Sequence, residues 1–195
     1  MLSFAVWDQC DPGKRRDRDM IDPRRRAILN SLIREHHRGA ARWPLLLHGP
    51  AGTGKTCVAL CLLDYAKEHP ETFSGWCPAY MVCSDWTAAV TQARLGKYYP
   101  VGCRGPIYEH ELWEWYQNKR LVCIDEIGTR QTVSDTAYEV LKLSLDRREG
   151  RPLIVVSNLD LEGIARAYDD RIASRLSAGV RLKFTGDDLR EKKHG

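Results

Sequence analysis

The chain has 195 residues, of which 43% are hydrophobic and 29% charged, and its formal net charge is +4. This length and composition predict one globular domain and exclude a disordered, collagen-like or low-complexity protein. The longest apolar runs are far too short for a membrane-spanning helix, so we expect no membrane partner.

Two segments precede the first predicted strand. Residues 1–22 mix Gly, Pro and charge and are predicted to form a loose tail, so the folded core is expected over 23–195. Pro23 suits the first turn of a helix that runs to about residue 37. The basic surplus lies here, because 14–38 hold nine Lys and Arg against four Asp and Glu. Such a run fits either a polyanion partner, such as nucleic acid, or a solvated face.

Short apolar runs then alternate with amphipathic patterns along the chain. Strands that alternate with helices indicate an open α/β sheet, and ligands of such sheets bind at the carboxyl ends of the strands. The predicted strands occupy 44–48, 79–83, 121–124, 153–156 and, as a fifth candidate, 180–184. The predicted helices occupy 55–68, 107–118, 133–145 and two pieces within 159–178. A further helix contains 86–93 and is capped by Ser84 or Asp85.

A glycine-rich segment between the first strand and the next helix matches the phosphate-binding pattern G-x-x-x-x-G-K-[ST]. Its glycines let the backbone curl, so that successive N–H groups and the positive end of the helix face a phosphate. Lys55 supplies a point charge to the β- and γ-phosphates, and the Thr56 hydroxyl is a ligand for Mg²⁺. The residues expected to bind the nucleotide here are Gly49, Pro50, Ala51, Gly52, Thr53, Gly54, Lys55 and Thr56.

Two adjacent carboxylates, Asp125 and Glu126, follow the apolar run at 121–124. At the end of that strand we expect Asp125 to hold Mg²⁺ through water and Glu126 to polarise an attacking water. Two acids at the end of a buried strand are costly without a nearby cation, which argues against a purely structural role. The pair favours hydrolysis over nucleotide storage and over the chemistry of small-molecule kinases.

Polar residues also follow the fourth predicted strand, and a later helix carries two arginines. Asn158 is expected close to the γ-phosphate and its water, although a Ser-Asn pair is also a common turn and helix cap. Arg171 and Arg175 lie four residues apart, hence on one helix face. They either reach the active site of a neighbouring subunit and stabilise its transition state, or they bridge to Asp169 and Asp170 on the surface.

In this order the motifs resemble those of the AAA+ ATPases, and most of all the DnaC/IstB-like branch of bacterial helicase loaders and transposition helpers. The resemblance implies a P-loop NTPase core, an α/β fold with a five-stranded parallel sheet flanked by helices. It also implies ATP with Mg²⁺ as cofactors and assembly with copies of the same chain. It spans about 45–190 and rests on the general nucleotide motifs together with 124–128, 157–158, 170–176 and 185–190.

The resemblance assigns roles to individual residues. It implies that Asn158 senses the γ-phosphate and that Arg175 is a finger acting in trans, with Arg171 close by. Arg190 is similar to a second sensor. Because only 37 residues follow Asn158, we expect the helical lid to be reduced or absent, which leaves the role of Arg190 open.

The family also carries a helical insertion between the second and third strands, here 84–118, which lines a channel for single-stranded DNA. Its loop at 94–99 interleaves cations with aromatic residues, a composition that suits attraction to the DNA backbone together with base stacking. The alternative is a solvated loop whose tyrosines pack on the domain.

Together these features predict an ATP-hydrolysing module that assembles with itself and acts on DNA. Loading of a replicative helicase is the first hypothesis, and help to a transposase is the second. A rival hypothesis is a scaffold that binds single-stranded DNA under nucleotide control with little turnover. Cys57, Cys61 and Cys123 fall in apolar patterns and are interpreted as reduced core residues, which predicts a cytoplasmic protein.

Overall fold

The computed structural model describes residues 23–75, 77–100, 103–128 and 133–186. The predicted tail at 1–22 and Arg190 lie outside these residues. Within them, no helix is both long enough and apolar enough to cross a membrane. The six cysteines in this part of the chain are not joined by disulfides.

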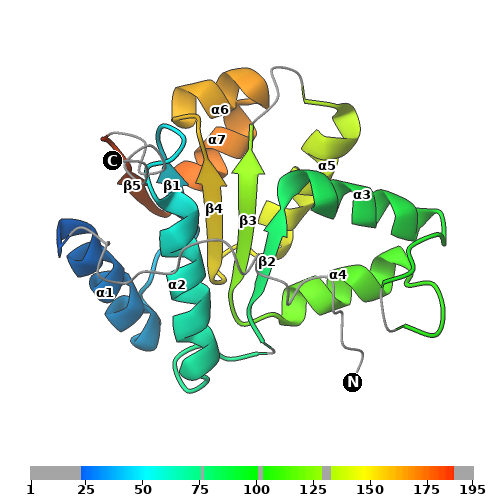
Figure 1. The fold of residues 1–195 in the computed structure, drawn as a ribbon, viewed down its shortest axis with the longest axis horizontal. Coiled ribbons are helices and arrows are strands. Elements are labelled where there is room, and N and C mark those ends of the chain that lie inside the picture. Colours follow the sequence, from blue (N-terminus) through cyan, green and yellow to red (C-terminus); the bar gives the residue numbers. More distant parts are fainter. Residues whose placement is uncertain (1–22, 76, 101–102, 129–132, 187–195) are drawn as a thin grey trace, which may run out of the picture.

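Five strands form one sheet in the order β2-β3-β4-β1-β5, and every neighbouring pair is parallel (Figure 1). This arrangement confirms the predicted α/β class and its five-stranded parallel sheet. Because β3, β4 and β1 are neighbours, the segments that follow their carboxyl ends meet at one edge of the sheet. The strand bounds are β1 (Leu45–His48), β2 (Ala79–Val82), β3 (Val122–Ile127), β4 (Leu153–Ser157) and β5 (Val180–Lys183).

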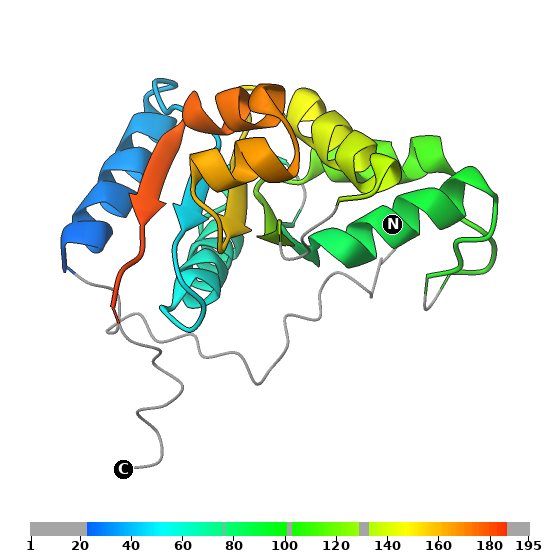
Figure 2. The same ribbon diagram turned by 90° about the horizontal axis from the view of Figure 1, so that it is seen from above.

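Helices cover both faces of the sheet, because alternate residues of each strand point to opposite sides. Apolar residues of α1 and α2 pack with Leu45 and Leu47 on one face, whereas those of α3 to α7 pack with Leu46 on the other. The α3–α4 pair extends beyond β2, and α1 lies beside β5 (Figure 2). The helix bounds are α1 (Pro23–His37), α2 (Lys55–Glu68), α3 (Cys83–Arg94), α4 (Glu109–Asn118), α5 (Asp135–Arg147), α6 (Leu161–Ala167) and α7 (Asp170–Ser177).

The last turn of α1 holds this helix on the core through two histidines. His36 stacks on Phe73, with ring centroids 4.6 Å apart, and its Nδ1 accepts a hydrogen bond from Trp43 Nε1 at 3.4 Å. His37 Nε2 lies 2.9 Å from Thr72 Oγ1. Burial, with the neighbouring His37 as a smaller cause, lowers the pKa of His36. The docking of α1 therefore depends on a neutral imidazole.

Strand β3 ends later than the sequence predicts. The apolar run ends at Ile124, yet β3 continues to Ile127, so Asp125 and Glu126 lie inside the strand rather than after it. The register against β4 shifts between Ile124 and Ile127. The reason for the extension is that Ile127 is fully buried in the core again after the polar pair.

Helix starts also differ from the predictions, among them those of α3 and α4. Helix α3 begins at Cys83, which was expected to end the preceding strand, and Val82 is its N-cap. Helix α4 begins at Glu109 rather than at 107, because Ile107 forms an isolated antiparallel bridge with Tyr98. The last described element is β5, so the predicted reduction of the lid stays a prediction.

Candidate nucleotide-binding site

The phosphate-binding segment, 49–56, links β1 to α2 at the carboxyl edge of the sheet. The backbone φ is 136° at Gly49, 74° at Gly52 and 91° at Gly54, values that residues with a side chain rarely adopt. Gly49 has a second constraint, because a Cβ added there would lie 2.1 Å from the Phe184 carbonyl oxygen. The curled backbone runs directly into the first turn of α2, where N–H groups lack helical acceptors.

Lys55 is the first residue of α2, and its ammonium folds back over this loop. Nζ donates to the carbonyl oxygens of Gly49 and Pro50, both at 2.6 Å, and Lys55 is only 6% exposed. Thr53 Oγ1 donates to the same Pro50 oxygen at 2.8 Å. A positive charge therefore lies within a curled backbone at a helix N-terminus, and these groups fit a phosphate anion.

Asp125 is 1% exposed and accepts hydrogen bonds on both carboxylate oxygens. Thr56 Oγ1 and the Tyr80 hydroxyl donate to Oδ2 at 2.8 and 2.7 Å, and the Glu126 N–H donates to Oδ1 at 2.7 Å. The contact with Thr56 joins the start of α2 to β3. A hydroxyl and a carboxylate are hard oxygen donors of the kind that Mg²⁺ prefers, so the side chains fit the expected metal.

Glu126 is exposed at this edge and has a backbone conformation that is rare for its residue type. Its φ of 63° lies in the left-handed region, which costs a residue with a Cβ roughly 1–2 kcal/mol. Two side chains hold the backbone that follows. Ser157 Oγ donates to the Ile127 carbonyl at 3.0 Å, and the Gly128 N–H donates to the Tyr168 hydroxyl at 3.2 Å. The carboxylate is therefore presented by a strained backbone that these contacts support.

Tyr80 and Tyr168 are the residues that the sequence analysis missed at this site. Their hydroxyls meet Asp125 and Gly128 across 45 and 40 positions of sequence. Burial raises the pKa of both hydroxyls, which keeps each of them protonated. The one local signal was the polar tip of Tyr80 inside an otherwise apolar predicted strand.

Asn158 follows β4, the strand that lies between β3 and β1. The register places Ser157 opposite His48 on β1 and opposite Ile127 on β3. Asn158 is exposed at the same edge of the sheet as the phosphate-binding segment and Glu126. Burial lowers the pKa of His48, so this histidine adds no charge beside the loop near neutral pH.

The two arginines of α7 differ in their surroundings. Arg175 forms an ion pair with Asp146 of α5, whereas the surface alternative placed its partner at Asp169 or Asp170. Arg171 is exposed. Arg175 is therefore held against its own domain in the single chain.

Besides the ion pair of Arg175, a second contact joins α7 to α5. Asp169 is the N-cap of α7 and accepts from the Ile172 N–H at 2.8 Å, while the Tyr138 hydroxyl of α5 donates to its other oxygen at 2.7 Å. The direction of α7 is thereby set at both of its ends. Arg190, expected to be a second sensor, lies outside the described residues.

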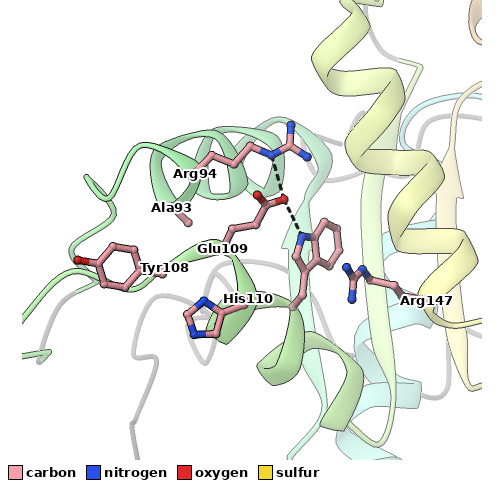
Figure 3. Close-up of a pocket in the computed structure, with 7 residues that line it drawn as sticks. Ala93, Arg94, Tyr108, Glu109, His110 and Arg147 are labelled. Carbon is pink, nitrogen blue, oxygen red and sulfur yellow. Dashed lines mark hydrogen bonds and ion pairs between the residues drawn. The ribbon is translucent and has the colours of Figure 1, made fainter.

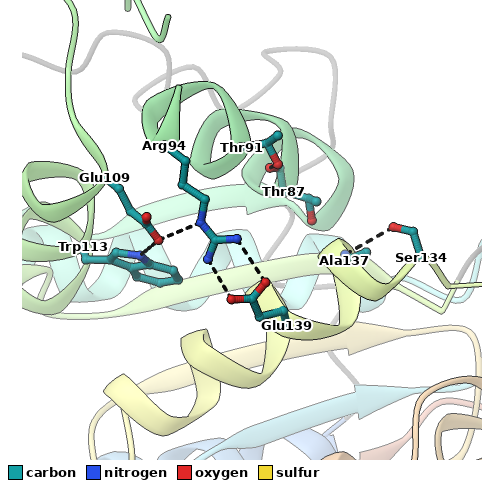
Figure 4. Close-up of polar contacts among 8 residues, drawn as sticks. All are labelled: Thr87, Thr91, Arg94, Glu109, Trp113, Ser134, Ala137 and Glu139. Atoms are coloured by element: carbon teal, nitrogen blue, oxygen red, sulfur yellow. Dashed lines mark hydrogen bonds and ion pairs between the residues drawn. The ribbon is translucent and has the colours of Figure 1, made fainter. Parts of the chain in front are cut away.

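The α3–α4 pair carries a groove of about 510 Å³ where it meets α5 (Figure 3). Arg94 does not project freely from this groove. Its guanidinium donates to Glu109 at 2.9 Å and to both oxygens of Glu139 at 3.0 and 3.1 Å (Figure 4). Arg94 therefore ties α3 to α4 and α5. The groove is lined by Ala93, Arg94, Tyr108, Glu109, His110, Trp113 and Arg147.

The sequence left two alternatives open for the loop at 94–99, a DNA-binding loop or a solvated loop with packed tyrosines, and the structure has features of both. Tyr98 is 8% exposed and packs in the core, as expected for a solvated loop with packed tyrosines. Tyr99 and Leu95 are 66% and 64% exposed, and Lys97 is exposed as well. The ring of Tyr99 and the ammonium of Lys97 therefore face solvent.

The sequence matches no protein-family model and no curated protein. The structure, by contrast, matches solved structures. AMPPCP-bound DnaA from Aquifex aeolicus has a TM-score of 0.64 at 18% identity, covering 89% of this chain and 50% of that one. The DnaC helicase loader has a TM-score of 0.62 at 16% identity, covering 82% and 89%. DnaI has a TM-score of 0.60 at 18% identity, covering 86% and 88%.

The chain has the AAA+ P-loop NTPase fold. It spans about half the length of the DnaA structure and most of the length of the DnaC and DnaI structures. Likeness at these identities shows the AAA+ fold alone, so roles for individual residues rest on the geometry described above.

Proposed function

We propose that this protein binds and hydrolyses ATP with Mg²⁺. The observation that carries the proposal is the 2.8 Å hydrogen bond between Thr56 and Asp125, which joins the phosphate-binding segment to the acidic pair in β3. Lys55 belongs to the phosphate-binding segment and Glu126 to the acidic pair. Few arrangements other than a metal–triphosphate site use an ammonium, a hydroxyl and a buried carboxylate in this order along the chain.

Each side chain has one task in this proposal. Lys55 exchanges its two carbonyl acceptors for phosphate oxygens, which are stronger acceptors because they are charged. Thr56 and Asp125 hold the Mg²⁺ that accompanies ATP, and this ion neutralises charge on the phosphates. Glu126, exposed and fixed by its backbone, orients the attacking water. Asn158 responds to the γ-phosphate from the neighbouring strand end.

Calorimetry and a phosphate-release assay test this function. Wild-type protein should bind ATP with Mg²⁺, and Lys55→Ala should abolish the binding. Glu126→Gln should retain binding and lose turnover, whereas Glu162→Gln, an exposed acid on α6, should behave as wild type. Folded wild-type protein that takes up no ATP would contradict the proposal. Turnover by Glu126→Gln would leave ATP binding intact and favour another base.

We also propose that copies of the chain assemble side by side and that Arg175 completes the site of the neighbour. Assembly would exchange its ion pair with Asp146 for a contact to the neighbour's phosphates. Glu126→Gln protein still offers this arginine, and Arg175→Ala protein still offers the catalytic acid, so a mixture should regain turnover that neither shows alone. Arg166→Ala, at an exposed residue of α6, is the control and should be active unmixed. No recovery in the mixture would mean that each site is self-contained.

For the biological role we propose the loading of a replicative helicase in the cytoplasm, with help to a transposase as the alternative. The AAA+ fold shared with the DnaC helicase loader, over 89% of that structure, supports this choice. A loading assay distinguishes the roles, since the protein should increase the amount of helicase on single-stranded circles when ATP is present. Stimulation of strand transfer without helicase loading would favour the alternative. Activity of Glu126→Gln in either assay would favour the nucleotide-switched scaffold.

Single-stranded DNA is the proposed nucleic-acid partner of the α3–α4 loop. Among the solved structures of this fold is a DnaA bound to AMPPCP and single-stranded DNA, with a TM-score of 0.63 at 17% identity. Tyr99 offers an exposed ring for stacking, worth about 1–3 kcal/mol per base, and Lys97 an exposed charge. Tyr99→Ala should therefore weaken oligonucleotide binding by anisotropy, while Leu95→Ala in the same loop should not. Binding that does not weaken as salt increases would argue against phosphate contacts.

A further inference from the structure

Tyr80 is a buried tyrosine on β2, an edge strand of the sheet, and it is 8% exposed. Its hydroxyl donates to Asp125 Oδ2 at 2.7 Å, the same oxygen that the Thr56 hydroxyl reaches from α2. The Glu126 N–H occupies Oδ1. The carboxylate is thus held from three directions by β2, by α2 and by its own strand.

The sheet geometry explains how Tyr80 reaches this oxygen. The register places Tyr80 opposite Cys123 and Val82 opposite Asp125, so the tyrosine lies two residues behind the carboxylate on the next strand. Residues two apart share one face of a sheet and are separated by roughly 6.6 Å along the strand. A tyrosine side chain that leans along its strand spans a similar length. Phenylalanine in this place would fill the same space and leave Oδ2 with one donor fewer.

A carboxylate with so little exposure depends on these donors, because water cannot replace them. Thr56 belongs to the phosphate-binding segment and would hold Mg²⁺ together with Asp125. The Tyr80 contact involves no atom of the phosphate-binding segment. It therefore fixes the orientation of the carboxylate before nucleotide or metal arrives.

We propose that Tyr80 is a positioning residue for Mg²⁺, which holds Asp125 in the orientation that receives the metal. This inference rests on the proposed function of the site. Groups that orient metal-binding side chains typically change metal affinity by about 10- to 100-fold when removed.

The test is the Mg²⁺ dependence of ATP binding, measured by calorimetry at increasing Mg²⁺ concentration. Tyr80→Phe should raise the Mg²⁺ concentration at half-maximal effect about 10-fold and leave the affinity for metal-free ATP unchanged. Tyr116→Phe is the matched control, because this buried tyrosine also donates one hydrogen bond, to the Ser144 carbonyl at 3.0 Å, outside the site. It should lower stability without moving the Mg²⁺ midpoint.

A double-mutant cycle shows whether Tyr80 acts through Asp125. In an Asp125→Asn background, Tyr80→Phe should cause no further change in the Mg²⁺ midpoint. Should Tyr80→Phe fail to fold, 4-fluorophenylalanine incorporated at position 80 fills the space of tyrosine without a donor and should give the same shift. An unchanged midpoint in a folded variant would overturn the role of Tyr80. Wild-type protein whose ATP affinity ignores Mg²⁺ would overturn the proposed metal site as well.

Discussion

Replacing Glu126 with glycine separates the chemistry of the site from the strain of its backbone. The φ of 63° at Glu126 costs a residue with a Cβ roughly 1–2 kcal/mol, whereas glycine adopts this conformation freely. Glycine also increases the conformational entropy of the unfolded chain, which costs about 0.4–1 kcal/mol relative to alanine. The balance predicts that Glu126→Gly is more stable than Glu126→Ala by about 0.5–1 kcal/mol.

The comparison between the glycine and alanine variants isolates the free-energy cost of the strained backbone at position 126. Both variants lack the carboxylate, and both keep the N–H that binds Asp125 Oδ1 at 2.7 Å. For a chain of this length the expected difference corresponds to a Tm that is about 1–4 °C higher for the glycine variant. Both variants should bind ATP and neither should hydrolyse it, because the group that orients water is gone.

Thermal melts, urea unfolding and phosphate release on wild type and three variants provide the assay. Glu126→Gln keeps a side chain of the same length and the same strained φ, so its stability should follow the alanine variant rather than the glycine variant. An alanine variant as stable as the glycine variant would refute the strain at this position. Turnover by the glycine variant would refute the catalytic role of the carboxylate.

Three further predictions concern the stability of the fold. Gly49→Ala should lower stability by about 1–3 kcal/mol, because its Cβ would lie 2.1 Å from the Phe184 carbonyl oxygen; an unchanged urea midpoint would contradict this close approach. Burial lowers the pKa of His36, so the folded state binds fewer protons there than the unfolded state, and stability should fall as the pH drops below about 6.5. His36→Phe should flatten this dependence in urea titrations at several pH values, and an equally steep loss would point to other groups. Arg148 is 2% exposed and donates to three backbone carbonyls, so Arg148→Lys, with one nitrogen, should lower stability by about 2–4 kcal/mol, and a Tm equal to that of wild type would contradict this role.

The elements of the fold were predictable because they depend on neighbours in the chain. Apolar residues at a period of two or of 3.6 mark strands and helices whatever lies elsewhere, and the predicted α/β sheet is confirmed on that basis. The phosphate-binding segment at 49–56 is equally local, since its own glycines supply the conformations that its backbone adopts. The end of β3 was less predictable. A polar pair interrupts the apolar pattern there, and only the burial of Ile127 shows that the strand continues.

Three contacts of the site could not be found in this way: Tyr80 with Asp125, Tyr168 with Gly128, and Arg175 with Asp146. Each joins segments that lie far apart in the chain. Their proximity follows from the order of the strands and from the way the helices pack across both faces of the sheet. Local patterns specify which face of an element is apolar but not which element covers it. Any apolar face can be buried against any other, so the pattern does not select the partner. The side chains that position the acids therefore become recognisable only when the whole sheet is assembled.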